Sequence, residues 1–348
     1  MIKEAITLLI DGQSLTMEQA AEVMEELTTG QVTPAQFGAF VTALRMKGET
    51  ADEIAGLASV MRAKSVRVET TEPVIDIVGT GGDNSRSFNI STAAALVAAG
   101  AGIKVAKHNN RAMTSQCGSA DVLEALGMKI ELDANQVKDC LEKVGIGFMF
   151  APLFHPSMKF AATPRREIGI CTIFNILGPL TNPALAESQV LGVPSEELGE
   201  KMAQVLYRLG SKHALVVHGL NGMDEISVDG KSRVWELEDD EITDYQVSPE
   251  DFGFTMAGVE TLLGGTPQEN AMMLRSVLEG EKGPRRDAVI MNAAAGIVVG
   301  QRTKNSSGLP ALKEGAEIAR EAIDSGQARD KLERLIKLSQ SFGRETCF

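Results

Sequence analysis

A short strand-like run that ends abruptly in glycines limits the possible folds of this chain more than any other feature. The run is Val74-Ile75-Asp76-Ile77-Val78, and the segment Gly79-Thr80-Gly81-Gly82-Asp83 follows it directly. Glycine has no Cβ and adopts positive φ readily, so backbone N–H groups in such a turn can approach an anion closely. The spacing matches neither GxGxxG nor a P-loop, so an ordinary tight turn remains the alternative. The segment alone predicts a buried strand with a candidate anion site at its end.

Hydroxyl and amide side chains follow the glycines and favour the anion site. They are Ser85, Ser87, Asn89, Ser91 and Thr92, and an alanine-rich helix is expected from Ala93. The N-terminus of a helix carries unpaired N–H groups and the positive end of the helix dipole. A glycine turn beside such a terminus predicts a binding site for phosphate.

A second polar loop follows the next expected strand, residues 103–106. It comprises Lys107-His108-Asn109-Asn110-Arg111-Ala112-Met113-Thr114-Ser115, and Gly118-Ser119-Ala120-Asp121 comes soon after. Open α/β sheets bind ligands at the carboxyl ends of their strands. A solvated loop is the alternative, but an acidic protein has little other reason to place Lys107 and Arg111 beside a glycine-rich turn. Ser119 is also expected to cap the helix that follows it.

Composition and charge exclude several classes of protein. The 348 residues are 43% apolar and 23% charged, as in a globular protein, and the net charge of −13 disfavours general nucleic-acid binding. No apolar stretch of the sequence reaches the roughly 20 residues of a membrane helix, and the N-terminus is unlike a signal peptide. The four cysteines form no CxxC pair and suit a reduced cytosol. We therefore expect a cytoplasmic protein that binds small molecules, with no nucleic-acid or membrane partner.

The chain divides near residue 70 into a helical part and an α/β part. Three capping boxes, at Thr16, Thr33 and Thr50, predict helices in residues 1–70. Strand-like runs then alternate with helical stretches, which is typical of a mostly parallel sheet. The expected strands are 74–78, 103–106 and 214–217, with Ala288–Met291 as a further candidate. We expect residues 236–244 to be a solvated loop or edge and residues 312–338 to form one or two amphipathic helices.

Together these segments and one more resemble the hallmark strings of the anthranilate phosphoribosyltransferases of tryptophan biosynthesis. The strings GTGGD, NIST, KHGNR, GSADVLEALG and TIFNxLGPLxNP stand here at 79–83, 89–92, 107–111 (as KHNNR), 118–127 and 172–183. Related pyrimidine nucleoside phosphorylases share the fold but lack this combination. The resemblance implies a small N-terminal helical domain (1–70, completed by helices near 168–188) and a large α/β domain (71–345) with a mostly parallel sheet, usually in a homodimer.

The resemblance also implies where the donor, 5-phosphoribosyl 1-diphosphate (PRPP), would bind. The implied residues are Gly79, Thr80, Gly81, Gly82, Asp83, Ser87, Asn89, Ile90, Ser91, Thr92, Lys107, His108, Asn109, Asn110, Arg111, Ala112, Met113, Thr114, Ser115 and Ser119. Ser91, Asp224 and Glu225 would act on Mg²⁺, a hard cation that suits carboxylates together with water and substrate oxygens. From the residues alone, Asp224 and Glu225 would be solvated loop charges.

For the acceptor, anthranilate, the resemblance implies Gly79, His108, Asn110 and Arg165. Arginine can pair a carboxylate through two parallel contacts, and only the resemblance favours Arg165 over Arg166 and over a surface role. No acid or base is assigned, because an aromatic amine is neutral at pH 7, and Lys107 and Arg165 are expected to act electrostatically. We expect His155 and His213 to be packing or surface histidines.

Two positions depart from the family strings. Asn109 replaces a glycine, and asparagine is the least costly substitute if the position needs positive φ. Cys171 stands where arginine is common, and we expect a buried, inert thiol rather than a reactive one. The expected enzyme is a pentosyltransferase that forms N-(5-phosphoribosyl)anthranilate and diphosphate. The alternatives are a phosphoribosyltransferase or phosphorylase for another aromatic or nucleobase acceptor, and a non-catalytic binding protein of the same fold.

Overall fold

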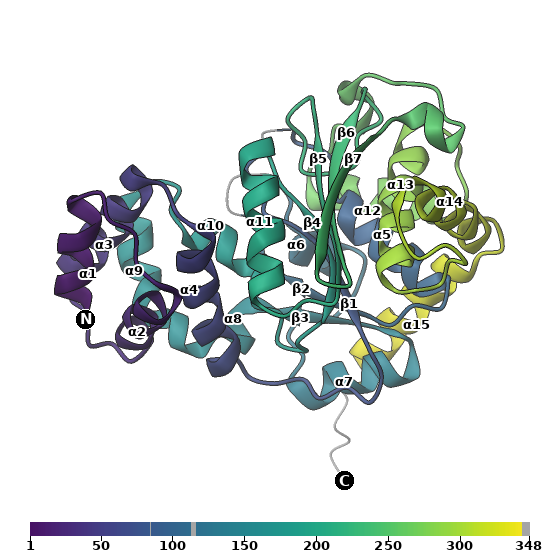
Figure 1. The fold of residues 1–348 in the computed structure, drawn as a ribbon. Helices are drawn as coiled ribbons and strands as arrows, with labels where there is room; N and C mark the ends of the chain where they lie inside the picture. The colour runs from purple at the N-terminus through teal and green to yellow at the C-terminus, as the bar shows by residue number, and fades with distance from the viewer. Residues whose placement is uncertain (84, 113–115, 343–348) are drawn as a thin grey trace, which may run out of the picture.

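The computed structural model describes residues 1–83, 85–112 and 116–342 and places a helical part beside an α/β part (Figure 1). A sheet of seven strands runs through the α/β part in the order β3-β2-β1-β4-β5-β6-β7. The strands are β1 (Ile75–Gly79), β2 (Val105–Asn109), β3 (Ile146–Phe150), β4 (Ser188–Gly192), β5 (His213–Gly219), β6 (Ser232–Glu238) and β7 (Glu241–Val247). The first five strands are parallel and the last two antiparallel, so the prediction of a mostly parallel sheet is confirmed.

Four helices precede the sheet: α1 (Ile2–Ile10), α2 (Met17–Thr28), α3 (Pro34–Lys47) and α4 (Ala51–Lys64). The last three begin at the predicted capping boxes, and each threonine hydroxyl accepts a hydrogen bond from the N–H three residues later. Helix α1 was not predicted, because it has no side-chain cap. Its charged N-terminus lies instead 2.8 Å from Glu26 Oε1 on α2.

Helices cover both faces of the sheet. On one face lie α5 (Ile90–Gly100), α13 (Pro284–Val299), α14 (Gly308–Asp324) and α15 (Gln327–Ser341), and on the other lie α11 (Glu196–Arg208) and the helical part (Figure 1). The other α-helices are α6 (Ser119–Ala125), α7 (Ala134–Lys143), α8 (Ala151–Phe154), α9 (Lys159–Ile168), α10 (Phe174–Leu177) and α12 (Pro267–Leu278). Alanine-rich α5 and α13 pack closely and are almost wholly buried.

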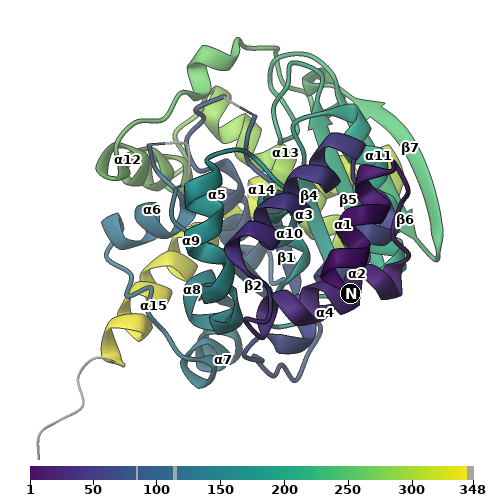
Figure 2. The same cartoon turned by 90° about the vertical axis from the view of Figure 1, so that its left-hand side faces the viewer.

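The apolar cluster on the α11 face joins the helical part to the sheet. Its buried members include Leu57 of α4, Met202 of α11, Val216 of β5 and Trp235 of β6. Helices α9 and α10 also contact α3 and α4, on the side that faces the viewer in Figure 2. The helical part is therefore held to the sheet by apolar packing as well as by chain connections.

Two expectations for the α/β part need correction. Ala288–Met291 lies inside α13 and is not a strand, because periodicity cannot distinguish a strand from a helix that is buried on all sides. Residues 236–244 form the β6–β7 hairpin, and β7 is an edge strand as expected. Glu236, however, is buried, and its carboxylate accepts from Tyr245 Oη and lies 2.8 Å from His213 Nε2. His213 is accordingly a packing residue.

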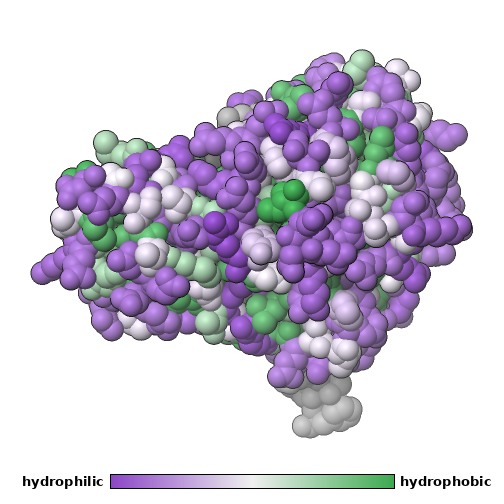
Figure 3. Space-filling model, viewed as in Figure 1, coloured by the Kyte–Doolittle hydropathy of each residue, from purple (hydrophilic) through white to green (hydrophobic). Residues whose placement is uncertain are grey.

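No helix in the described part of the chain is both long and apolar enough to cross a bilayer. The face seen in Figure 3 is mainly hydrophilic, with small separate apolar areas. Exposed apolar side chains on the helical part and α9 include Ile10, Met46 and Phe160.

Candidate active site

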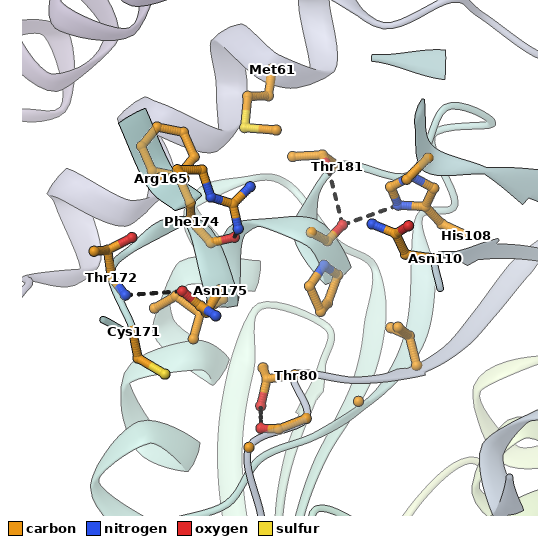
Figure 4. A pocket seen from close by; sticks show the side chains of 18 of the residues that line it. Met61, Thr80, His108, Asn110, Arg165, Cys171, Thr172, Phe174, Asn175 and Thr181 are labelled. Atoms are coloured by element: carbon orange, nitrogen blue, oxygen red, sulfur yellow. Dashed lines mark hydrogen bonds between the residues drawn. The ribbon is translucent and has the colours of Figure 1, made fainter. Parts of the chain in front are cut away.

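A large cavity lies where the helical part meets the carboxyl ends of the parallel strands. Its volume is about 1120 Å³, and its lining includes Met61 of α4, Gly79–Gly82, His108–Ala112 and residues between 171 and 181 (Figure 4). Open α/β sheets bind ligands at the point where the strand order reverses. That point here lies between β1 and β4. Both polar loops selected from the sequence reach this cavity.

The glycine turn after β1 makes room for the loop after β5. Gly81 and Gly82 have φ of 69° and 82°, which are left-handed values that favour glycine. The Gly81 N–H donates to Asp224 Oδ2 at 2.8 Å. A Cβ on Gly79 would overlap Asp224 Oδ2, and one on Gly192, its partner on β4, would overlap the Asp224 carbonyl oxygen. The absence of a Cβ at Gly79 and Gly192 therefore leaves space for Asp224 at the point where the strand order reverses. The role of Gly192 was not predicted from the sequence.

Three carboxylates, those of Asp83, Asp224 and Glu225, gather at this edge. Asp224 is 9% exposed, so it is not the solvated loop charge that the residues alone suggest. Burial, followed by the charge of Asp83, raises the pKa of Asp224 to about 7. Burial and the charge of Asp224 raise the pKa of Glu225 well above its ordinary value, and Lys107 opposes that rise. The charged forms of these two carboxyl groups are therefore disfavoured, and a cation bound beside them would stabilise those forms.

The donor atoms at this edge fit a hard divalent cation such as Mg²⁺. One or two protein carboxylates suffice for Mg²⁺ when substrate oxygens and water complete its shell. Asp83 Oδ2 is buried and has no hydrogen-bond partner, so this oxygen is available to a cation. Among the described residues, no group of three or more His, Cys, Asp or Glu side chains is arranged to hold a metal alone. A metal here would depend on substrate oxygens.

Lys107 extends from β2 beneath the glycine turn. Its side chain is 1% exposed, and Nζ donates to a β1 carbonyl oxygen and, at 3.4 Å, to Ser91 Oγ. Burial lowers the pKa of Lys107, whereas the charges of Asp76, Glu225 and Asp224 raise it. The ammonium group thus lies between β1, the start of α5 and the carboxylates.

The N-terminus of α5 is fixed by a side chain that the sequence analysis did not select. Helix α5 begins one residue after Asn89, so Ser91 and Thr92 lie in its first turn. Asn89 Oδ1 accepts from Asn270 Nδ2 at 2.9 Å, and Asn270 Oδ1 accepts from a loop N–H at 2.7 Å. Asn270 lies on α12, 181 residues along the chain, so no local pattern could have found it. Ser87 is paired with another loop in an isolated β-bridge.

Asn109 lies in β2, opposite Phe150 of β3, with an ordinary strand backbone. Its φ is not positive, so the condition under which asparagine was expected to replace glycine does not hold. The side chain is 5% exposed, and neither Oδ1 nor Nδ2 has a hydrogen-bond partner. An unpaired amide is therefore buried where β2 reaches the cavity.

Helix α6 involves two of the predicted donor-site residues, Arg111 and Ser119. The Arg111 guanidinium is paired with Asp121 and Glu124 of α6. Helix α6 begins at Ser119 itself, with Gly118 at the cap position, so the prediction of Ser119 as N-cap is wrong. The Asp121 carboxylate accepts from the Gly118 N–H at 2.9 Å and performs the capping instead. Three further predicted donor-site residues lie outside the described residues: Met113, Thr114 and Ser115.

Neutral aromatic rings form part of the opposite side of the cavity. His108 Nδ1 lies 3.1 Å from the Gly178 carbonyl oxygen, and its ring centre is 5.0 Å from that of His155. Burial is the main cause that lowers the pKa of His108 to about 3 and that of His155 to about 4. Both rings are therefore neutral near pH 7. His155 lines the cavity, a role that sequence reasoning missed.

Arg165 projects from α9 into this side of the cavity. Its guanidinium carbon lies 5.3 Å from the centre of the Phe174 ring, and Nη2 donates to the Phe174 carbonyl oxygen at 3.5 Å. Figure 4 shows the two side chains next to each other. Burial lowers the pKa of Arg165. Arg166 is exposed and does not line the cavity. The structure therefore places Arg165, and not Arg166, in the cavity, a distinction that the residues alone could not make.

Cys171 precedes α10 and also lines the cavity (Figure 4). It is exposed, so the expectation of a buried thiol is wrong. The residue lies just before a turn in which the Thr172 N–H donates to Asn175 Oδ1 at 2.9 Å. The turn buries Thr172 and leaves Cys171 outside the packed segment.

Comparison with known proteins assigns the chain to a family. Residues 3–65 match the helical bundle domain of the glycosyl transferase family, and residues 71–329 match its α/β domain. The anthranilate phosphoribosyltransferase of Dehalococcoides mccartyi is 60% identical over 343 residues, which cover 98% of this chain and 99% of that protein. The chain belongs to the anthranilate phosphoribosyltransferase family. The anthranilate phosphoribosyltransferase of Acetivibrio thermocellus is 50% identical and covers 98% of each chain.

Solved structures of anthranilate phosphoribosyltransferases share the fold. The Thermus thermophilus enzyme is 45% identical, with a TM-score of 0.90 over 97% of this chain and 99% of that one. The Saccharomyces cerevisiae enzyme in complex with PRPP and Mg is 30% identical, with a TM-score of 0.88 over 98% of each chain. The same enzyme in complex with 4-fluoroanthranilate gives a TM-score of 0.86. The predicted fold, a small helical part with a large α/β part, and the predicted class of pentosyltransferase are confirmed.

Proposed function

We propose that the cavity transfers the 5-phosphoribosyl group of PRPP to the amino nitrogen of anthranilate. A bond forms between that nitrogen and C1 of the ribose, the bond from C1 to diphosphate breaks, and the nitrogen loses a proton. The observation that carries this proposal is a cavity with two unlike sides. One side is the glycine turn, whose Gly81 N–H binds the Asp224 carboxylate, and the other is an aromatic side with Arg165. Complexes of the S. cerevisiae relative with PRPP and Mg and with 4-fluoroanthranilate support it.

PRPP would bind along the glycine turn, the N-terminus of α5, and the end of β2 together with the loop that follows it. The binding residues would be Gly79–Asp83, Ser87, Asn89–Thr92, Lys107–Ser115 and Ser119. The unpaired N–H groups and positive dipole end of α5 suit a phosphate. Lys107, 3.4 Å from Ser91 Oγ, would place positive charge beside the diphosphate.

Ser91, Asp224 and Glu225 would hold Mg²⁺, with the unpaired Asp83 oxygen close by. When bound, the ion would neutralise charge that develops on the departing diphosphate. Lys107 and the N–H groups of the turn would act on the same charge from the protein side. The chain's own part in this step is to keep these groups fixed before substrate arrives.

Anthranilate would lie on the aromatic side, with its carboxylate paired to Arg165 and with Gly79, His108 and Asn110 around the ring. A planar guanidinium suits a carboxylate through two contacts. The amine is neutral at pH 7, so a strong base is not required and positioning supplies much of the catalysis. Lys107 and Arg165 therefore contribute as charges and not as acid or base.

The loss of anthranilate fluorescence on mixing protein, PRPP and Mg²⁺ tests the proposal, with EDTA as the control. We expect a loss that depends on metal. A flat signal with anthranilate, accompanied by calorimetric binding of PRPP, would leave the donor site intact and reject the acceptor. Other aromatic acids and nucleobases would then be tested in its place.

We also propose the assembly implied by the resemblance. Residues 1–70, completed by helices near 168–188, would form one domain and residues 71–345 the other, in a cytoplasmic homodimer. Exposed Ile10, Met46 and Phe160 on the helical side offer apolar surface for a second copy. Light scattering should give twice the chain mass of 37.1 kDa, and a monomer mass would reject the dimer.

A further inference from the structure

Asn292 of α13 binds the backbone of Ile226, the residue after Glu225, through both its side-chain oxygen and its side-chain nitrogen. Oδ1 accepts from the Ile226 N–H at 2.9 Å, and Nδ2 donates to the Ile226 carbonyl oxygen at 3.0 Å and to the Ala288 carbonyl oxygen at 2.9 Å. Asn292 is 1% exposed, so these bonds are shielded from solvent. Both backbone polar groups of the residue after Glu225 are thus tied to a helix 66 residues away.

The remainder of the loop has separate supports. The Gly219 N–H donates to the Met223 carbonyl oxygen at 2.9 Å, and Asn221 links the Met223 N–H to Ser227 Oγ. Asp224 is held by the Gly81 N–H described above. These bonds fix the loop on either side of residues 225 and 226. Residue 226 is fixed by Asn292, whose helix packs against β1, β4 and β5.

Asp224 and Glu225 directly precede Ile226 in the chain, so a shift of the Ile226 backbone would move both carboxylates. Side chains that hold metal ligands in place are known to affect metal affinity strongly. We propose that Asn292 is a positioning residue for the metal site, which fixes the backbone of Ile226 and thereby the Asp224 and Glu225 carboxylates. The inference rests on the proposed function, in which those carboxylates hold Mg²⁺.

Binding of Mn²⁺, measured by electron paramagnetic resonance with and without PRPP, tests the inference on the full chain. For Asn292→Ala we expect affinity for Mn²⁺ to fall by about tenfold or more, with the KM for anthranilate within about twofold. Ser339→Ala is the structural control, because it removes the hydrogen bond from the Lys129 N–H to Oγ of buried Ser339 on α15. We expect that control to lower the melting temperature and to leave affinity for Mn²⁺ unchanged.

Two further variants, Asn292→Gln and the reference variant Asp224→Asn/Glu225→Gln, distinguish failure of this inference from failure of the proposed metal site. Asn292→Gln keeps the amide and moves it by one methylene, so it carries the same test and the same expected loss if Asn292→Ala does not fold. Unchanged affinity for Mn²⁺ in the Asn292 variants, with loss in Asp224→Asn/Glu225→Gln, would overturn the inference alone. Unchanged affinity in the reference variant as well would overturn the proposed metal ligands and the inference together.

Discussion

Burial shifts the pKa values on the two sides of the site in opposite directions, and on both sides it favours the neutral form. On the donor side, burial and neighbouring carboxylates raise the pKa of Asp224 to about 7 and that of Glu225 well above its ordinary value. On the acceptor side, burial lowers the pKa of His108 and His155 so far that both rings are neutral near pH 7. A cation would shift these carboxyl groups back to their charged forms, whereas the histidine pair is neutral near pH 7. An ionic leaving group and a neutral amine call for these two environments.

Removal of the charges on the donor side should have the largest effect. For Asp224→Asn with Glu225→Gln, we expect kcat/KM to fall on the order of 10³-fold, because the carboxylates would hold the cation that stabilises the leaving group. Fluorescence assays over a range of Mg²⁺ concentrations measure it. Asp239→Asn/Asp240→Asn, an exposed acidic pair in the β6–β7 turn, is the matched control. Unchanged Mg²⁺ dependence in the first variant would contradict the assignment.

A substitution at Gly192, which lies against the loop that carries Asp224, provides a second test that changes no charge. Gly192→Ala places a Cβ against the Asp224 carbonyl oxygen, so the loop must shift. We expect activity to fall on the order of 10²-fold, since displacements of about 1 Å have effects of that size. Gly38→Ala on α3, where a Cβ meets nothing closer than 3.9 Å, should keep full activity. Equal activity of the two variants would show that the loop position does not matter.

On the acceptor side, the planar guanidinium should matter more than its charge. Arg165→Lys keeps the charge and loses the two parallel contacts, so the KM for anthranilate should rise by about tenfold. The KM for PRPP should remain within about twofold if the two sides act separately. Arg166→Lys, at an exposed position outside the cavity, serves as the control. An equal rise in the KM values for anthranilate and PRPP would show that Arg165 does not act on the acceptor alone.

Neutral histidine on the acceptor side predicts an effect on stability. An unfolded histidine has a pKa near 6.5 and His155 one of about 4, so the unfolded state binds more protons between these pH values. Stability is therefore lost as pH falls through this range. His155→Gln should remove about 2 kcal/mol of the loss between pH 7 and pH 5. Denaturant unfolding at both pH values measures the difference, and an identical loss in both proteins would contradict a neutral, buried ring.

Local chemistry explains which parts of the fold could be predicted. The capping boxes at Thr16, Thr33 and Thr50 combine groups within three residues, and all three helices begin there. Helix α1 has no such cap and was missed. The buried run Ala288–Met291 has no polar side to indicate its period, so it was mistaken for a strand.

The site was predictable where its groups follow strand ends and not where distant segments meet. The glycine turn after β1 lines the cavity, and Lys107 of β2 donates to Ser91 Oγ at the start of α5. Gly192, Asn270 and Asn292 act through contacts with Asp224, Asn89 and Ile226, which lie far away in the sequence. Their roles depend on which segments become neighbours in the fold, and the local pattern around each residue does not indicate that.

The cluster that joins the helical part to the sheet has a consequence for unfolding. Buried side chains of α2, α3, α4, α11 and the outer sheet face belong to one apolar cluster. Separating the two parts would expose that cluster to water, so they should melt in one cooperative transition rather than in two. The sequence contains a single tryptophan, Trp235, which is 3% exposed within the cluster and packs against Gly199 of α11. The fluorescence of Trp235 should therefore change when this cluster is exposed to water, so it reports the unfolding of the junction without an added label.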